Sequence, residues 1–153
     1  MNPPSPSPGF VVDCSVSAAW IFEEQADAYT ESALDALAQA PALAPAWWRV
    51  EMVNVLLMLE KRGRLSATDA VQALRMLERL PVQTEDRASS AFDLHALARR
   101  HQLTSYDALY LDVALARGLP IATRDKALAR AAVDSGIGVW APENSTTSPA
   151  LRP

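Results

Sequence analysis

The chain has 153 residues, of which 50% are hydrophobic, and a formal net charge of −4. This length supports one domain with a single core, and the apolar content excludes a disordered chain. The acidic balance argues against binding of nucleic acid through a simple basic surface, but it does not exclude an enzyme that binds phosphate through metal ions.

The small numbers of cysteine and histidine residues limit the kinds of site that the chain can form. Cys14 is the only cysteine, which excludes an internal disulfide and fits a reducing, cytoplasmic location. We expect it to be buried and inert. The only two histidines, His95 and His101, argue against a histidine-based zinc site.

The ends of the chain differ in composition from its middle. Four prolines fall within the first nine residues, so residues 1–8 are predicted to be a disordered tail, as are residues 143–153. A folded domain is expected over residues 9–142. No segment reaches the roughly 18 apolar residues of a membrane span, so we expect no membrane association.

Short apolar runs alternate with longer segments of helical periodicity along this domain. The predicted strands are residues 10–12, 42–44, 81–83, 120–122 and 138–140. The predicted helices are residues 15–24, 26–39, 46–62, 66–79, 87–100, 106–117 and 126–135. Short strands separated by helices predict an α/β domain with a parallel sheet.

Acidic residues lie where several of these elements begin or end. Asp13 directly follows the first predicted strand, Asp125 lies just past the fourth, and Asp107 falls in the first turn of the helix 106–117. Ligands of open parallel sheets bind outside the carboxyl ends of the strands. These three acids are therefore candidates for one shared site.

A fourth acid, Glu51, lies inside the predicted helix 46–62. On a helical wheel, Glu51 and Asn54 fall within about 60° of each other, whereas Arg49 and Glu60 lie on the opposite side. Most residues between these two stripes are apolar. Such a polar notch is expected to face a partner or a cavity.

Taken singly, each acid has an ordinary structural explanation. An Asp after a strand is commonly a helix cap, a Glu in a helix is commonly solvated, and an Asp in a first turn complements the helix dipole. Together they favour a metal site, because two carboxylates about 5 Å apart repel by roughly 3 kcal/mol at an effective dielectric of 20. A Mg²⁺ or Mn²⁺ ion bound between the carboxylates replaces this repulsion with attraction. Such ions also activate water and stabilise charge on a phosphate.

Other acid-rich phosphate sites fit this sequence poorly. A haloacid-dehalogenase phosphatase would have a second Asp two residues after Asp13, where Ser15 stands. A response-regulator receiver would have adjacent acids after its first strand, where Cys14 stands instead. The sequence also lacks a glycine-rich phosphate loop.

The order and context of the four acids resemble the PIN domain, and most closely the VapC-type toxin ribonucleases of bacterial toxin–antitoxin pairs. The matching segments span residues 11–140 and are a strand followed by Asp13-x-Ser15, Pro45 with Glu51-x-x-Asn54, Tyr106-Asp107-Ala-Leu-Tyr-Leu, and Thr123-x-Asp125. The resemblance implies a three-layer domain in which a parallel five-stranded sheet lies between helices.

The same resemblance implies an activity and partners. It implies Mg²⁺- or Mn²⁺-dependent cleavage of RNA, inhibition by a cognate antitoxin protein, and a homodimer. It assigns catalysis and metal binding to the four acids, and a supporting role by hydrogen bonding to three polar residues, Ser15, Asn54 and Thr123. The four acids are Asp13, Glu51, Asp107 and Asp125.

Two alternatives to a toxin remain open from the sequence. One is a housekeeping RNA-processing nuclease with the same chemistry, and the other is a non-catalytic module that binds RNA or protein. The adjacent Trp47 and Trp48 cannot both face one core, so one of them is expected at a subunit interface, where tryptophan is enriched. Stacking of an RNA base beside the site is the less favoured explanation from sequence alone.

Overall fold

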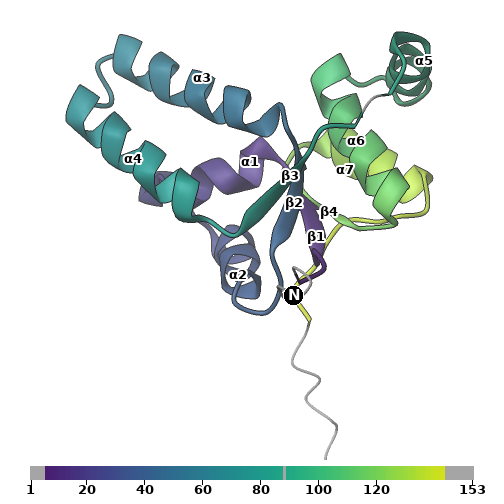
Figure 1. Cartoon of the computed structure of the whole chain (residues 1–153), viewed down its shortest axis with the longest axis horizontal. Coiled ribbons are helices and arrows are strands. Elements are labelled where there is room, and N and C mark those ends of the chain that lie inside the picture. Colours follow the sequence, from purple (N-terminus) through teal and green to yellow (C-terminus); the bar gives the residue numbers. More distant parts are fainter. Residues whose placement is uncertain (1–5, 88, 144–153) are drawn as a thin grey trace, which may run out of the picture.

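The computed structural model describes residues 6–87 and 89–143. Four short strands alternate with helices along the chain, and two 3₁₀ turns follow the first helix (Figure 1). In order, the elements are β1 (Phe10–Val12), α1 (Cys14–Ser17), η1 (Ala18–Trp20), η2 (Glu23–Gln25), α2 (Ala28–Ala36), β2 (Ala42–Pro45), α3 (Trp48–Lys61), α4 (Ala67–Arg79), β3 (Val82–Glu85), α5 (Ala91–His101), α6 (Ser105–Arg117), β4 (Ile121–Ala122) and α7 (Lys126–Asp134).

The four strands form one parallel sheet in the order β3-β2-β1-β4. Every residue of β1, β2 and β4 is buried, which requires a covering layer on both faces of the sheet. Helices α1–α4 lie on one side of the strands and α5–α7 on the other (Figure 1). The prediction of an α/β domain with a parallel sheet flanked by helices is confirmed.

The prediction of a five-stranded sheet is wrong by one strand. Residues 138–140 make only an isolated parallel bridge, between Val139 and Ile121. Two features limit this pairing: β4 itself has only two residues, and Gly138 has a φ of 75°, which takes the chain out of the extended conformation. The segment nevertheless stays attached to the sheet, because the Trp140 amide donates a hydrogen bond to the Ile121 carbonyl at 2.9 Å.

Side chains at the starts of the helices explain where several of them begin. Thr104 caps α6 by accepting a hydrogen bond from the Asp107 amide, and Asp125 caps α7 by accepting one from the Leu128 amide. Asp13 caps the single turn of α1. The predicted helix 15–24 is interrupted, since only residues 14–17 are α-helical and two 3₁₀ turns follow.

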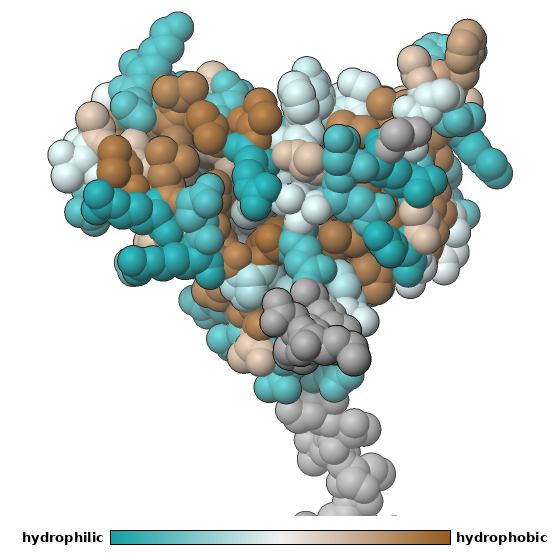
Figure 2. Space-filling model, in the orientation of Figure 1, coloured by the Kyte–Doolittle hydropathy of each residue, from teal (hydrophilic) through white to brown (hydrophobic). Residues whose placement is uncertain are grey.

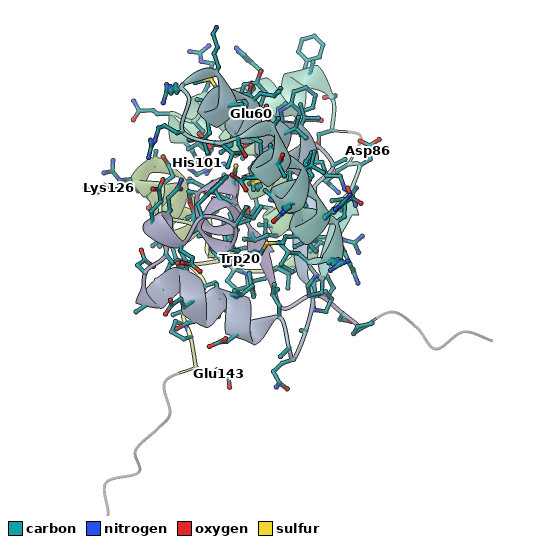
Figure 3. All side chains as sticks on the ribbon, turned by 90° about the vertical axis from the view of Figure 1, so that its left-hand side faces the viewer. Trp20, Glu60, Asp86, His101, Lys126 and Glu143 are labelled. Carbon is teal, nitrogen blue, oxygen red and sulfur yellow. The ribbon has the colours of Figure 1, made fainter. Side chains whose placement is uncertain are left out.

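Two buried tryptophans tie helices to one another around the core. The Trp48 indole is 1% exposed and donates a hydrogen bond of 2.8 Å to the Ser17 hydroxyl, which connects α3 to α1. The Trp20 indole donates one of 2.9 Å to the Thr30 carbonyl, which connects η1 to α2. Figure 3 shows Trp20 inside the molecule, whereas Asp86 and Lys126 lie at its periphery.

The predicted tails fall mostly on residues 1–5 and 144–153, which lie outside the described residues. Within the described part, the Pro6 carbonyl accepts a hydrogen bond from the Gln83 side chain at 3.2 Å, so residue 6 contacts β3. Among the described helices, none combines the length and the apolar character that crossing a membrane requires.

The opposite environments of the paired tryptophans give a test of the fold. Trp48→Phe should lower the free energy of unfolding by about 2–3 kcal/mol, because it removes buried volume and the indole donor to Ser17. Trp47→Phe should change it by no more than about 0.5 kcal/mol, because Trp47 is 42% exposed. Urea unfolding of both variants checks this, and equal effects would contradict the assignment of Trp48 to the core.

Candidate active site

Three of the four acids lie at the carboxyl edge of the sheet. Asp13 directly follows β1, and Glu51 lies in the first turn of α3, which begins just after β2. Helix α6 leads into β4, so its first turn, which carries Asp107, lies at the same edge. Parallel strands and their connections thus bring residues distant in sequence to one edge.

The Asp13 carboxylate is buried, with 6% of the residue exposed, and fully engaged by neighbouring donors. One oxygen accepts a hydrogen bond from the Ser15 amide, and the other accepts from the Ser15 hydroxyl and from the Thr123 hydroxyl. Burial nevertheless raises the pKa of Asp13, the hydrogen bonds from Thr123 and Ser15 offset part of that effect, and the charge of Asp107 adds to it.

Glu51 is half-buried and, unlike Asp13, has an oxygen without a donor. Burial and the charges of Asp13 and Asp107 raise the pKa of Glu51 to about 7. The Tyr110 hydroxyl is close enough to lower that pKa somewhat, yet among the described residues neither Glu51 Oε1 nor the Tyr110 hydroxyl has a hydrogen-bond partner. A buried carboxylate oxygen without a donor is expensive to maintain, so this atom is a candidate for binding a cation.

Asp107 is held in place by the cap of its own helix. The Thr104 hydroxyl donates a hydrogen bond of 2.7 Å to the Asp107 carboxylate and accepts one of 3.1 Å from the Asp107 amide. Asp107 shares the lining of a pocket of about 470 Å³ with Trp47, Val50, Glu51, Asn54, Thr104 and Tyr106. Asn54 therefore faces the pocket, although it makes no hydrogen bond to any of the four acids.

The remaining acid, Asp125, stands to one side of this group. Its carboxylate caps α7, accepting a hydrogen bond of 2.8 Å from the Leu128 amide, and its charge is not among those that raise the pKa of Asp13 or Glu51. It is connected to the group through Thr123, whose hydroxyl accepts a hydrogen bond from the Asp125 amide at 3.0 Å and donates to Asp13.

Arg124 is a residue that the sequence reasoning missed. Its guanidinium donates hydrogen bonds to the Ser15 carbonyl (2.6 and 3.0 Å), to the Gln25 carbonyl (2.8 Å) and to the Asp27 carboxylate (3.3 Å). Its own amide donates to the Ser15 hydroxyl at 2.9 Å. Arg124 thereby fastens the loop that carries Thr123 to the turn that carries Asp13. Arg124 lies between Thr123 and Asp125, two residues assigned to the site from the sequence, and this position could have indicated its role.

Tyr110 and Cys14 complete the surroundings of Glu51. Tyr110 lies three residues after Asp107 and so on the same side of α6, a spacing that could have indicated its place beside the site. Burial and the charges of Glu51 and Asp13 raise the pKa of Cys14 to about 12. The partly buried thiol is therefore protonated at neutral pH, the form that is not nucleophilic.

The donor atoms of this site suit a hard divalent cation. Asp13, Glu51 and Asp107 offer carboxylate oxygens whose charges interact unfavourably with one another, and Glu51 Oε1 is buried without a partner. Within residues 6–87 and 89–143, no three Asp, Glu, His or Cys side chains converge tightly enough to form a ready ligand set. The fit therefore rests on the oxygen chemistry and on the unpaired Glu51 oxygen.

Glu51→Gln should stabilise the protein in EDTA, and more at pH 8 than at pH 5. The pKa of Glu51 is raised from 4.5 to about 7 in the folded protein. Its favourable contribution to the free energy of unfolding is therefore complete below pH 4.5 and is lost as the pH rises through about 7. The gain at pH 8 should be roughly 1–2 kcal/mol, allowing for solvent screening of a half-buried side chain.

Urea unfolding at both pH values measures this difference between Glu51→Gln and wild type. The matched control is Glu60→Gln, which lies on the same helix about 180° around from Glu51 and should leave the difference near zero. A Glu51→Gln protein that is less stable than wild type at pH 8 would show that the carboxylates do not repel one another.

Comparisons with known proteins agree with this fold. The PIN domain family model matches residues 10–134. Ribonuclease VapC3 from two strains of Mycobacterium tuberculosis is 34% identical over 95 residues, which cover 62% of this chain and 68% of the relative. The crystal structure of PAE2754 from Pyrobaculum aerophilum shares the fold, with a TM-score of 0.61, 23% identity and coverage of 81% of this chain and 79% of that one. The chain therefore belongs to the PIN domain family and is of the VapC type.

Proposed function

We propose that the protein is a metal-dependent endoribonuclease and the toxin of a type II toxin–antitoxin system. The observation that carries the proposal is the group of acids at the sheet edge, in which the pKa values of Asp13 and Glu51 are raised and one Glu51 oxygen has no partner. Family membership supports the same activity, since the relative with 34% identity is named a ribonuclease.

Asp13, Glu51 and Asp107 would hold the cation, Mg²⁺ or Mn²⁺, with Asp125 as the fourth proposed catalytic acid. When bound, such an ion polarises a phosphate and lowers the pKa of water. The chain itself fixes the carboxylates before any ion arrives. Ser15 and Thr123 orient Asp13, and Thr104 orients Asp107, through the hydrogen bonds described above.

A catalytic role explains the site better than a binding module without metal would. Buried carboxylates near one another destabilise a fold unless something cationic meets them. A module that only bound RNA or protein would have no use for a half-buried Glu51 without a donor. A housekeeping nuclease would share this chemistry and would differ only in its target and its partners.

The exposed apolar side chains of α3 and α4 support a protein partner. Val50, Val53, Leu57 and Met58 on α3, and Val71 and Met76 on α4, are all between 39% and 57% exposed. Figure 2 shows apolar atoms gathered on the part of the surface where α3 and α4 lie. Apolar patches of this kind mark protein contacts, and we propose that a cognate antitoxin and a second copy of the chain are the partners, in the cytoplasm.

Cleavage of RNA should require added Mg²⁺ or Mn²⁺ and stop in EDTA. Asp13→Asn and Glu51→Gln should each lower the rate by more than about 100-fold, and Thr123→Val should lower it by about 10- to 100-fold, as expected for a residue that orients a metal ligand. Glu60→Gln, on the far side of α3, should leave the rate unchanged. A gel assay of labelled RNA measures these rates. Cleavage that persists in excess EDTA would contradict the metal mechanism.

Growth distinguishes a toxin from a housekeeping nuclease. Induced expression of the wild-type chain should arrest bacterial growth, because uncontrolled RNA cleavage stops protein synthesis, and Asp13→Asn should not. Co-expression of the protein encoded by the neighbouring gene should restore growth. Normal growth during expression of a chain that cleaves RNA in vitro would favour the housekeeping role.

A further inference from the structure

Two aromatic side chains stack on each other at the rim of the candidate active site. The rings of Trp47 and Tyr106 have centroids 5.9 Å apart and planes inclined by 18°. Trp47 is the N-cap residue that directly precedes α3, and Tyr106 lies in the first turn of α6. The stack therefore joins the starts of two helices that lie on opposite sides of the sheet (Figure 1).

Both rings remain accessible although they are large and apolar. Trp47 is 42% exposed and Tyr106 is 52% exposed, whereas the neighbouring Trp48 is 1% exposed. Neither the Trp47 indole N–H nor the Tyr106 hydroxyl makes a hydrogen bond within the described residues. The two rings thus form an aromatic surface that is accessible to a ligand.

This surface is continuous with the acids. Trp47 lies one helical turn before Glu51, and Tyr106 directly precedes Asp107. All four side chains line the same pocket of about 470 Å³. A molecule that stacks on the rings therefore has its adjoining groups within the pocket that the carboxylates line.

The charge of the protein makes stacking a useful source of RNA affinity. With a net charge of −4, the chain gains little from general attraction to the phosphate backbone. Stacking of a base on an aromatic ring contributes about 1–3 kcal/mol per base and does not depend on charge. It requires an unpaired base, since a paired base is already stacked within its helix.

We propose that the Trp47–Tyr106 stack is a platform for one unpaired base of the RNA substrate, adjacent to the phosphate that is cleaved. This inference rests on the proposed ribonuclease function. The platform selects single-stranded segments and loops over duplex, and it tolerates different bases, because every base has a flat aromatic face.

The competing occupant of these rings is a second copy of the chain. A subunit contact over the platform would also cover Glu51 and Asp107, which lie in the same pocket. Covering two carboxylates without a cationic partner is unfavourable, and it would close the site to RNA. A base carries its own phosphate toward the acids, so it suits the pocket better.

The test measures binding in a chain that cannot cleave. The full-length Asp13→Asn variant keeps every residue of the pocket lining and is mixed, in Mg²⁺, with a short single-stranded oligouridylate. Affinity is measured by fluorescence anisotropy. A single abasic site is moved through the oligomer, and 2-aminopurine at the sensitive position reports stacking by loss of its fluorescence.

In this background, Trp47→Ala and Tyr106→Leu should each weaken binding by about 5- to 150-fold, and Trp47→Phe and Tyr106→Phe by no more than about threefold. One abasic position should weaken binding to a similar extent, and Trp47→Ala should add little to that loss, as expected for two partners of one contact. Phe92→Ala is the matched control: Phe92 is 88% exposed on α5 and lies outside the pocket lining, so its removal should leave affinity unchanged.

Several results would overturn the platform. One is that intact and abasic oligomers bind with equal affinity at every position of the abasic site. Another is that Trp47→Ala leaves the affinity unchanged, and a third is that the Asp13→Asn chain binds no oligomer. Sedimentation tests the subunit contact: a dimer that Trp47→Ala converts to a monomer, with equal weakening for intact and abasic RNA, would assign the rings to an interface instead.

The wild-type chain, assayed in parallel for cleavage, separates this inference from the proposed function. Cleavage without any dependence of binding on the base would overturn the platform and leave the nuclease standing. Base-dependent binding without cleavage would overturn the nuclease and support the platform.

Discussion

The hydrogen bonds that converge on the Asp13 carboxylate are the interaction on which the rest of the structure depends. A buried charge at the end of β1 is tolerated only because Ser15 and Thr123 donate to it. Thr123 follows β4, so the same bonds fix the ends of two adjacent strands relative to each other. Arg124 strengthens this link by holding the backbone of Ser15. The fold and the site therefore share one set of contacts.

Glu51 differs from Asp13, since its position lowers the stability of the fold. Asp13 has donors for both of its oxygens, whereas Glu51 Oε1 is buried without one, and the repulsion between the two acids acts on top of burial. Proteins retain such strained groups mainly where function uses them. The contrast separates the two acids: the hydrogen bonds to Asp13 hold the fold together, while the unpaired oxygen of Glu51 is the atom that the proposed cation would meet.

Local signals in the sequence predicted the places of Asp13 and Asp107 well, because a strand end and a capped first turn are set by neighbouring residues. The prediction of a fifth strand failed because a strand must pair with a neighbouring strand, and β4 offers only two residues for pairing. Arg124 and Tyr110 were missed for a related reason: their contacts reach residues about 100 and 60 positions away, which periodicity does not reveal. Spacing can point to such residues, but their distant partners become visible only once the chain has folded.

The helix starts connect these observations. Trp47, the N-cap residue of α3, lies one turn before Glu51, and Tyr106 and Asp107 are adjacent on α6. The start of each helix therefore presents one aromatic ring and one carboxylate at the edge of the sheet. On α6, the Thr104 cap that fixes Asp107 also fixes the adjacent Tyr106, since both residues move with the same backbone. An RNA segment stacked on the rings would thus have its phosphate set against the carboxylates by rigid elements instead of mobile loops. Such preorganisation would position the substrate without a basic surface, and it would reconcile an acidic protein with the proposed polyanionic substrate.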